Sequence, residues 1–183
     1  MAAFFIGVPV DRVWLKYLGG TASVVVILLL AFDLFIWRWL PKWLVKRPNI
    51  RGTWKATLQS NFIGQDGKPV EKVCYIVIRQ NYSKICVEML FDISNSVSAS
   101  AEIVQGNGRP ALWYTYRSEA HALKQEGNPP HRGATTLYIA DTPRVALEGD
   151  YWTERNTTGR IETSGRNKKL ADSFRGAGQL TYK

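Results

Sequence analysis

The sequence predicts a mainly β protein, in which an N-terminal membrane helix precedes an eight-stranded antiparallel up-and-down β-barrel of the lipocalin or streptavidin type. Three observations predict this fold. A long apolar segment lies near the N-terminus, apolar and polar residues alternate through the rest of the chain, and turn residues separate most of the alternating runs. With 183 residues, 45% of them hydrophobic, the chain can form one ordinary folded domain but not a large multidomain enzyme.

The apolar segment spans residues 17–37 and contains one charged residue, Asp33. As a helix rising about 1.5 Å per residue, it reaches about 30 Å, the thickness of a bilayer's hydrocarbon core. A cleaved signal peptide is the alternative, but the segment is long, and Trp37-Arg38-Trp39-Leu40-Pro41 stands where a small-residue cleavage site would lie. We therefore expect a retained span. An uncleaved signal anchor and a buried core helix remain as alternatives, and the short apolar stretch Phe4–Val10 is compatible with one pass or two.

Basic residues are more numerous after the span than before it. Two precede it, and four follow it closely: Arg38, Lys42, Lys46 and Arg47. Because Lys and Arg concentrate on the cytoplasmic side of a membrane, we expect everything after Trp37 to lie in the cytoplasm. The chain then divides into residues 1–47, a transmembrane region with a basic linker, and residues 48–183, a cytosolic ligand-sensing barrel. The net charge of the whole chain, +9, permits an anionic ligand.

Asp33 is unusual inside so apolar a segment. A carboxylate within a bilayer is costly and tends to mark a polar contact between helices. Small residues let helices approach closely, and Gly19 and Gly20 supply them here. We expect Asp33, Gly19 and Gly20 to mediate assembly of the membrane helix. The alternative is that Asp33 tilts toward the interface or is protonated.

Eight alternating runs are expected to be strands: residues 51–60, 71–80, 83–92, 96–105, 111–118, 132–141, 145–155 and 157–164. Their short connections and the lack of intervening helices favour an antiparallel meander. Closing such a sheet into a barrel removes its two open edges. A β-sandwich is the alternative. Helical spacing in the tail predicts one short helix within residues 166–176.

The second and third runs can be tested for a hairpin. With Asn81-Tyr82 as a two-residue turn, the paired residues would be Gln80–Ser83, Ile78–Ile85, Ile76–Val87 and Cys74–Met89. This register places apolar side chains on one face of both strands. It also places Cys86 on the face opposite Cys74, so that we expect no disulfide between them.

Catalytic and metal-binding patterns are scarce. The two cysteines lack CxxC spacing, the two histidines form no cluster, and no glycine-rich phosphate loop occurs. Glu148, Asp150 and Glu154 alternate along one run, which is typical of a solvated outer face. We therefore expect a protein without a metal, a cofactor or a catalytic site, and not an enzyme.

Candidate ligand-binding residues occupy the inward positions of three runs. On the seventh, Leu147 and the side-chain-free Gly149 mark the inner face. The candidates that share inner faces are Tyr151, Thr153 and Arg155 on the seventh run, Tyr114 and Tyr116 on the fifth, and Trp54 on the first. Aromatic rings can stack on bases, and an inward arginine needs an anion. The alternative is plain packing, with Trp54 closing the barrel base and the tyrosines filling its rim.

Two motifs carry a resemblance. The segment RPNIRGTW (Arg47–Trp54) and the later LEGDYWTERNTTGRIE (Leu147–Glu162), together with the basic N-terminal membrane segment, resemble the CBASS antiphage effectors called CD-NTase-associated protein fifteen. The resemblance covers essentially the whole chain. One departure is that the family is described with two membrane helices, whereas only one span is clear in this sequence.

The resemblance implies a small β-barrel that binds a cyclic oligonucleotide, foremost a cyclic dinucleotide, made by a partner CD-NTase. Binding would drive homo-oligomerisation in the bacterial inner membrane, disrupt the lipid bilayer and cause abortive cell death. No DNA or RNA polymer is implied as a partner. The alternative function is a membrane-anchored, lipocalin-like module that binds a lipid or another hydrophobe and has no signalling role.

Overall fold

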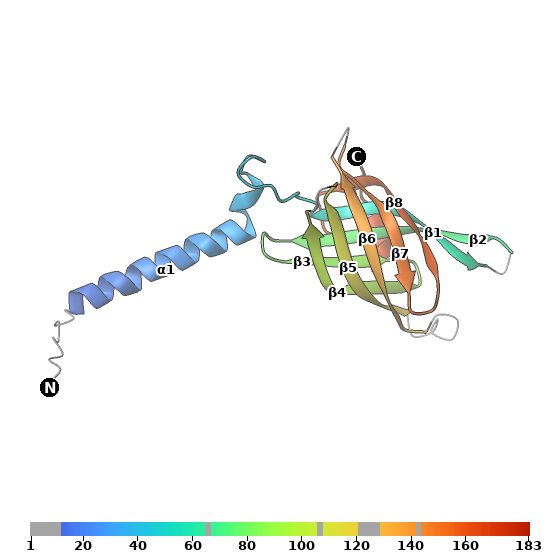
Figure 1. The fold of residues 1–183 in the computed structure, drawn as a ribbon, viewed down its shortest axis with the longest axis horizontal. Helices are drawn as coiled ribbons and strands as arrows, with labels where there is room; N and C mark the ends of the chain where they lie inside the picture. The colour runs from blue at the N-terminus through green and yellow to red at the C-terminus, as the bar shows by residue number, and fades with distance from the viewer. Residues whose placement is uncertain (1–11, 65–66, 106–107, 121–128, 142–143) are drawn as a thin grey trace. The chain divides into compact units, whose positions relative to one another are not determined.

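The computed structural model describes residues 12–64, 67–105, 108–120, 129–141 and 144–183, with side chains from residue 23 onward (Figure 1). Its elements are α1 (Arg12–Leu34), the 3-10 turn η1 (Ile36–Arg38), β1 (Gly52–Ile63), β2 (Pro69–Gln80), β3 (Ile85–Leu90), β4 (Ser94–Val104), β5 (Ala111–Ala120), β6 (His131–Ala140), β7 (Ala146–Thr153), β8 (Thr158–Asn167) and α2 (Phe174–Gly178). They form two compact units, Met1–Lys46 and Arg47–Lys183.

The first unit contains α1 and a folded turn. The side chains from Val24 to Leu30 are 53–63% exposed, and Asp33 lies half-buried in the last helical turn. Within the described part of the chain, no helix combines the length and the apolar content needed to span a bilayer. The span predicted for residues 17–37 therefore stays a prediction. Gly19 and Gly20 lie in α1, outside the residues whose side chains are described.

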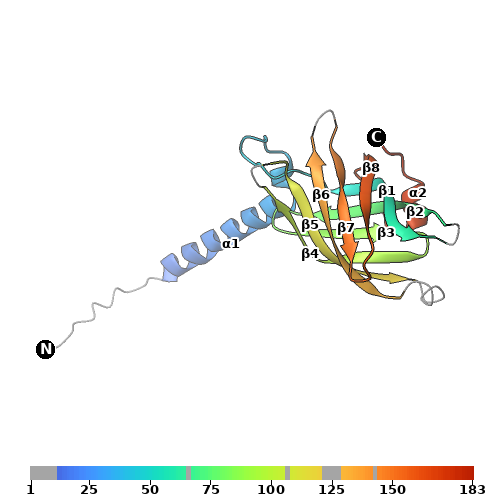
Figure 2. The same ribbon diagram turned by 45° about the vertical axis from the view of Figure 1, so that its right-hand side comes forward.

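The second unit is a closed barrel in which each strand pairs with its sequence neighbours and β1 pairs with β8 (Figures 1 and 2). Every pairing is antiparallel. The predicted eight-stranded up-and-down barrel is thus confirmed, and the β-sandwich is wrong. Closure satisfies the ladder hydrogen bonds that two edge strands would leave open.

The predicted register of the β2–β3 hairpin is wrong by two residues. Ile76 lies opposite Met89, and Ile78 lies opposite Val87. The turn contains four residues, not two, and the Asn81 amide donates to the Lys84 carbonyl at 2.8 Å. A shift of two residues moves the pairing along the strand but leaves every side chain on its expected face. Cys74 and Cys86 therefore lie on opposite faces, and both are free, as predicted.

Alternation determines what most strands bury, whereas residues 74–78 of β2 are buried on both faces. In β5, Leu112, Tyr114 and Tyr116 are buried, whereas Trp113 between them is exposed. In β7 the buried positions are the odd-numbered ones, from Leu147 to Thr153. The core inside the barrel is built from such positions on all eight strands.

The segment that leads into β1, residues 48–51 of the second unit, closes one end of the barrel. Ile50 and Trp54 are fully buried, and the Trp54 indole Nε1 donates to the Ile50 carbonyl at 2.9 Å. The buried Gln80 accepts from the Ile50 amide with Oε1 and donates to the Pro48 carbonyl with Nε2, both at 2.9 Å. The Arg166 guanidinium stacks over Trp54 at 5.1 Å. This end of the barrel is therefore plugged.

The C-terminal segment covers the outside of β2. The ring of Tyr75 meets Phe174 edge-on at 5.2 Å and stacks on Tyr182 at 5.7 Å. The helix predicted within residues 166–176 is displaced: β8 continues to Asn167, and α2 begins at Phe174, after Ser173 accepts from the Gly176 amide as its N-cap. The displacement arises because residues 166 and 167 complete pairing with β1.

Candidate ligand-binding cavity

A cavity of about 500 Å³ occupies the barrel interior towards the β3–β4 and β7–β8 connections, at the end opposite the Trp54 plug. Its volume lies in the range of small-molecule binding sites. The lining residues come from all eight strands and two of their connections: Leu58, Ser60, Phe62, Val70, Lys72, Met89, Phe91, Ile93, Ser94, Ser96, Tyr116, Ser118, His131, Thr135, Tyr151, Thr153, Arg155, Thr157 and Ile161.

Two tyrosines line this cavity, and each faces a glycine on the neighbouring strand. Tyr116 of β5 lies opposite Gly133 of β6, and Tyr151 of β7 lies opposite Gly159 of β8. A Cβ at Gly133 would stand 2.5 Å from the Tyr116 hydroxyl, and one at Gly159 would stand 2.6 Å from a carbon of the Tyr151 ring. Each ring therefore occupies space next to its glycine that a Cβ would otherwise fill.

Burial controls the protonation of these rings. Removal from water raises the pKa of Tyr116, with a further rise from the neighbouring Tyr151. Burial also raises the pKa of Tyr151, while a hydrogen bond from Ser60 opposes the rise. Both phenols are neutral at neutral pH. Each can donate a hydrogen bond to an anionic oxygen while its ring face remains available for stacking.

Basic side chains lie at the rim. Arg155 Nη1 lies 3.4 Å from His131 Nδ1, and the basic side chain of Lys72 also lines the cavity. The turn that carries Arg155 is held by Thr153, whose Oγ1 accepts from the Arg155 and Thr157 amides at 3.2 and 3.3 Å. No Asp or Glu lines the cavity among the described residues. The charged side chains of the described lining are therefore those of Lys72 and Arg155, and both are basic.

One wall of the cavity carries hydroxyl groups. Ser94, Ser96 and Ser118 are buried and line it, with Ser96 opposite Ser118 across the β4–β5 pair. Thr135 is buried too, and its Oγ1 makes no hydrogen bond of good geometry within the described residues. Thr135 lies close enough to Tyr114 to lower the pKa of that phenol, against the larger rise caused by burial. The wall offers donors and acceptors to a polar ligand.

Four of the six residues predicted to bind ligand line this cavity: Tyr116, Tyr151, Thr153 and Arg155. The other two do not. Trp54 belongs to the plug, which was the alternative interpretation, and Tyr114 lies in the core, where its hydroxyl donates to Met89 Sδ at 3.2 Å. Arg155 follows β7 and stands exposed at the rim, not in the interior.

Sequence reasoning missed the serines, Lys72 and His131. A signal for the serines was available: in the segment SNSVSAS, Ser94 and Ser96 share one face by the period of two, and Ser118 shares the face of Tyr116. Lys72 and His131 gave no signal, because each lies at the end of its strand that faces the cavity opening. No group of side chains able to hold a metal ion occurs in the described residues.

The family described as "Cap15, cyclic dinucleotide receptor domain" matches residues 45–164, most of the chain. The chain belongs to the Cap15 family. Every residue that lines the cavity falls inside the matched range. A protein of Staphylococcus schleiferi named "CD-NTase-associated protein 15" is similar as well, with 31% identity over 158 residues, which cover 86% of this chain and 81% of that protein. The resemblance noted from the two sequence motifs is thereby confirmed.

Proposed function

We propose that this Cap15 family member is a non-enzymatic antiphage effector of the CBASS type, whose barrel binds a cyclic dinucleotide made by a partner CD-NTase. Support comes from the match of residues 45–164 to a cyclic dinucleotide receptor domain and from the name of the relative that matches most of the chain. The cavity is the site through which the messenger acts.

The observation that carries this proposal is the composition of the cavity. A cyclic dinucleotide presents two phosphates and two flat bases. Arg155, His131 and Lys72 at the rim suit the phosphates, and Tyr116 and Tyr151 offer ring faces to the bases. Buried hydroxyls on the facing wall suit the polar edges of the bases. The absence of a carboxylate from the described lining removes the repulsion that an anion would otherwise meet.

Binding is proposed to act through assembly in the bacterial inner membrane, with the barrel in the cytoplasm. The ligand shifts the equilibrium only if it binds the assembled state more tightly than the single chain. α1 is proposed as the anchor: the side chains between Val24 and Leu30 are apolar and exposed, which suits contact with lipid. Association of these helices would then disrupt the bilayer and kill the infected cell.

One observation favours the hydrophobe-binding alternative. Much of the lining is apolar, including Leu58, Phe62, Met89, Phe91 and Ile161. A long-chain fatty acid fits such a surface, with its carboxylate at Arg155. The rival ligands differ in what they need: the dinucleotide requires the hydroxyl wall, whereas an acyl chain does not.

Thermal unfolding of the full chain in mild detergent separates the two ligands. We expect stabilisation by at least one member of a panel of 3′,3′-cyclic dinucleotides, of about 2.7 kcal/mol when its concentration is one hundred times Kd. The corresponding linear dinucleotides, which have an extra charge and no ring closure, serve as controls. If palmitate raises the melting temperature and no cyclic dinucleotide does, the hydrophobe-binding function would be the correct one.

A further inference from the structure

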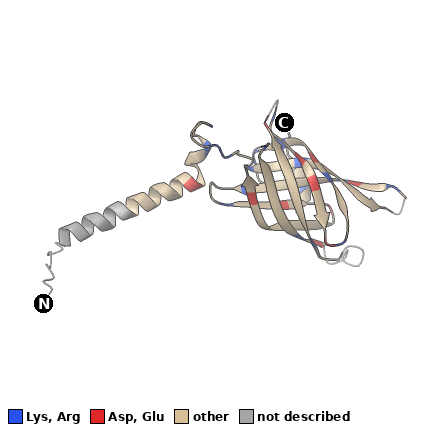
Figure 3. Cartoon of the chain, in the orientation of Figure 1, with Lys and Arg blue, Asp and Glu red and all other residues tan. Residues whose placement is uncertain are grey.

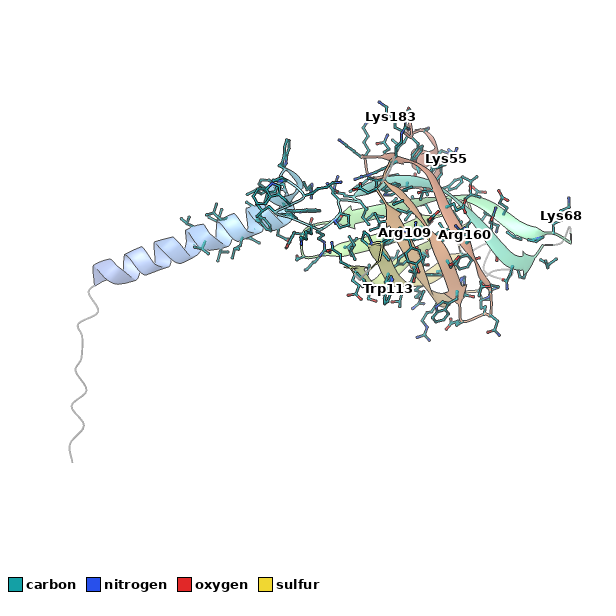
Figure 4. The ribbon with its side chains drawn as sticks, turned by 45° about the horizontal axis from the view of Figure 1, so that its top comes forward. Lys55, Lys68, Arg109, Trp113, Arg160 and Lys183 are labelled. Atoms are coloured by element: carbon teal, nitrogen blue, oxygen red, sulfur yellow. The ribbon has the colours of Figure 1, made fainter. Side chains whose placement is uncertain are left out.

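The hairpin of β1 and β2 extends past the rest of the barrel wall (Figures 1 and 2). β1 pairs with β8 only as far as Ser60, and β2 pairs with β3 only from Tyr75 onward. Beyond these points the two strands pair with each other alone, ending at Ile63 opposite Pro69. We call residues 61–64 and 67–72 the arm. Figure 4 labels Lys68 at its far end.

The arm exposes apolar surface. Phe62 is 55% exposed and Ile63 is 54% exposed. A two-stranded ribbon is marginally stable alone in water, and both of its edges are open here. Lys68 is next to this apolar pair, because its carbonyl accepts from the Gly64 amide at 2.8 Å. The arm therefore carries one exposed apolar side chain on each of its faces, with Lys68 near its tip.

A groove on the outer face of β5, β6 and β7 has the complementary composition. Its sides are formed by Trp113, Tyr138 and Trp152, which are 49%, 41% and 57% exposed. Between them the small residues Ala134 and Thr136 form the floor, since β6 pairs with β5 on one side and with β7 on the other. Figure 4 labels Trp113 on this wall of the barrel. Three exposed aromatic rings around a hollow are uncommon on a surface that meets only water.

An acidic group stands in the same groove. Asp150 is exposed and lines it, two residues before Trp152 on the same face of β7. Within the described residues its carboxylate makes no hydrogen bond or ion pair. The negative charge of Asp150 contributes to the raised pKa of the neighbouring Arg160. The Arg160 guanidinium itself forms ion pairs with Glu162 at 2.6 Å and Glu148 at 3.7 Å. Aromatic rings beside a carboxylate form a site for an ammonium or guanidinium group.

We infer that the groove of one chain receives the arm of a second copy, with Lys68 of the arm placed between the tryptophans and paired with Asp150. The alkyl stem of a lysine covers aromatic surface while its ammonium meets the carboxylate. Only one of the two exposed apolar side chains adds contact beside it, because Phe62 and Ile63 are neighbours in β1 and point to opposite faces of the arm. Arm and groove are different surfaces, so the contact is head-to-tail and leaves a free arm and a free groove at the two ends of every assembly.

This contact would be the means by which the proposed function assembles the chains. It rests on that function, because the bound messenger is what would promote the contact. Phe62 and Lys72 belong to the arm and also line the cavity, so a messenger bound there would contact the arm. Tyr151 faces the cavity between Asp150 and Trp152, which face the groove. A ligand that orders these segments reduces the conformational entropy lost when two chains associate. Confinement in a membrane also raises the local concentration of the second copy.

Zero-length cross-linking tests the contact without relying on the ligand. Full-length chains, half of them labelled with ¹⁵N, are reconstituted at high density in vesicles of phosphatidylethanolamine and phosphatidylglycerol and treated with a carbodiimide. We expect a mixed-isotope amide that joins Lys68 to Asp150, enriched at least tenfold over links from Lys55, which is exposed on the β1 wall. Intermolecular links at other positions with none between these two would overturn the inference.

Charge exchange provides the second measurement. Asp150→Lys and Lys68→Glu should each lower the cross-linked or energy-transfer signal for assembly at least tenfold, and the double variant should recover most of it. Asp172→Lys and Lys55→Glu, which alter exposed charges elsewhere, should leave the signal unchanged. Failure of the double variant to recover would exclude the Lys68–Asp150 pair. Failure of the wild-type chain to bind any cyclic dinucleotide would instead count against the proposed function.

Discussion

Arg155 combines position and charge at the cavity rim. Its amide is fixed by Thr153, and its guanidinium lies beside His131. Replacing Arg155 by Ala removes a charge-assisted contact with a phosphate, which is worth about 1.5–3 kcal/mol. We expect the affinity for the cyclic dinucleotide to fall about tenfold to hundredfold, as measured by titration calorimetry on the full chain.

Arg117→Ala is the matched control for this change. Arg117 lies on the outer face of β5 and pairs with Glu119 at 2.7 Å. Its removal should leave affinity unchanged within twofold. Equal losses in the two variants would mean that the general positive charge of the barrel binds the ligand, not the rim.

Buried ionisable groups predict weaker stability in alkali. Burial raises the pKa of Cys74 from 9.0 to about 12 and also raises the pKa of Tyr114 and Tyr116 above their ordinary values. The raised pKa values mean that the folded barrel holds protons that the unfolded chain releases. The stabilisation that these groups contribute is complete below pH 9 and is lost as the pH rises above it. Each group loses about 1.4 kcal/mol per pH unit between its pKa in the unfolded chain and its pKa in the folded barrel.

Denaturant unfolding of the full chain at pH 8, 9, 10 and 11 measures this loss. We expect the free energy of unfolding to be flat up to pH 9 and then to fall. Cys74→Ala should reduce the slope between pH 9 and 10, because it removes the buried thiol whose pKa is raised. A stability that rises or stays level from pH 9 to 11 would contradict the prediction.

At the scale of the strands, the cavity depends on two tyrosine–glycine pairs between neighbours. Gly159→Ala would place a methyl group against the Gln59 carbonyl and the Tyr151 ring, and Gly133→Ala would do the same against the Trp152 carbonyl and Tyr116. We expect each change to destabilise the barrel by about 1–3 kcal/mol, since closely packed strands must separate. Thermal unfolding monitored by circular dichroism measures the effect.

Gly108→Ala is the control for these substitutions, because nothing lies within 4 Å of the methyl group that it would add. Its melting temperature should equal that of the wild type. If Gly133→Ala and Gly159→Ala were as stable as Gly108→Ala, the rings would have moved, and the cavity described above would not be rigid.

At the scale of the whole molecule, sensing and killing are proposed to reside in different units. Asp33 lies in α1, within Met1–Lys46, whereas the cavity lies in Arg47–Lys183. Asp33→Leu removes the polar contact that we expect between membrane helices. It should abolish growth arrest on induction together with the partner CD-NTase, while ligand affinity and barrel melting stay unchanged.

Asp33→Asn, which keeps a hydrogen-bonding side chain, should retain most of the growth arrest. Immunoblotting of membrane fractions checks that all variants accumulate equally. Full killing by Asp33→Leu at normal levels would remove Asp33 from the proposed assembly.

The amino-acid sequence by itself determined which face of each strand is inside. Alternation with a period of two gave the eight strands, the opposite faces of Cys74 and Cys86, and the inward tyrosines of β5 and β7. These features depend only on parity, and the burial of one face specifies parity strongly. The family resemblance was likewise contained in two short motifs.

Tertiary structure decided how far each strand slides along its neighbour and therefore which side chains meet. A two-residue slip between β2 and β3 preserves parity, so the pattern could not distinguish the four-residue turn from a two-residue one. The exclusion of Trp54 and Tyr114 from the cavity, the seating of Tyr116 and Tyr151 on glycines, and the hollow between Trp113 and Trp152 all depend on that slide. Such contacts join residues far apart in the chain, and closure of the barrel fixes them by setting all eight registers together.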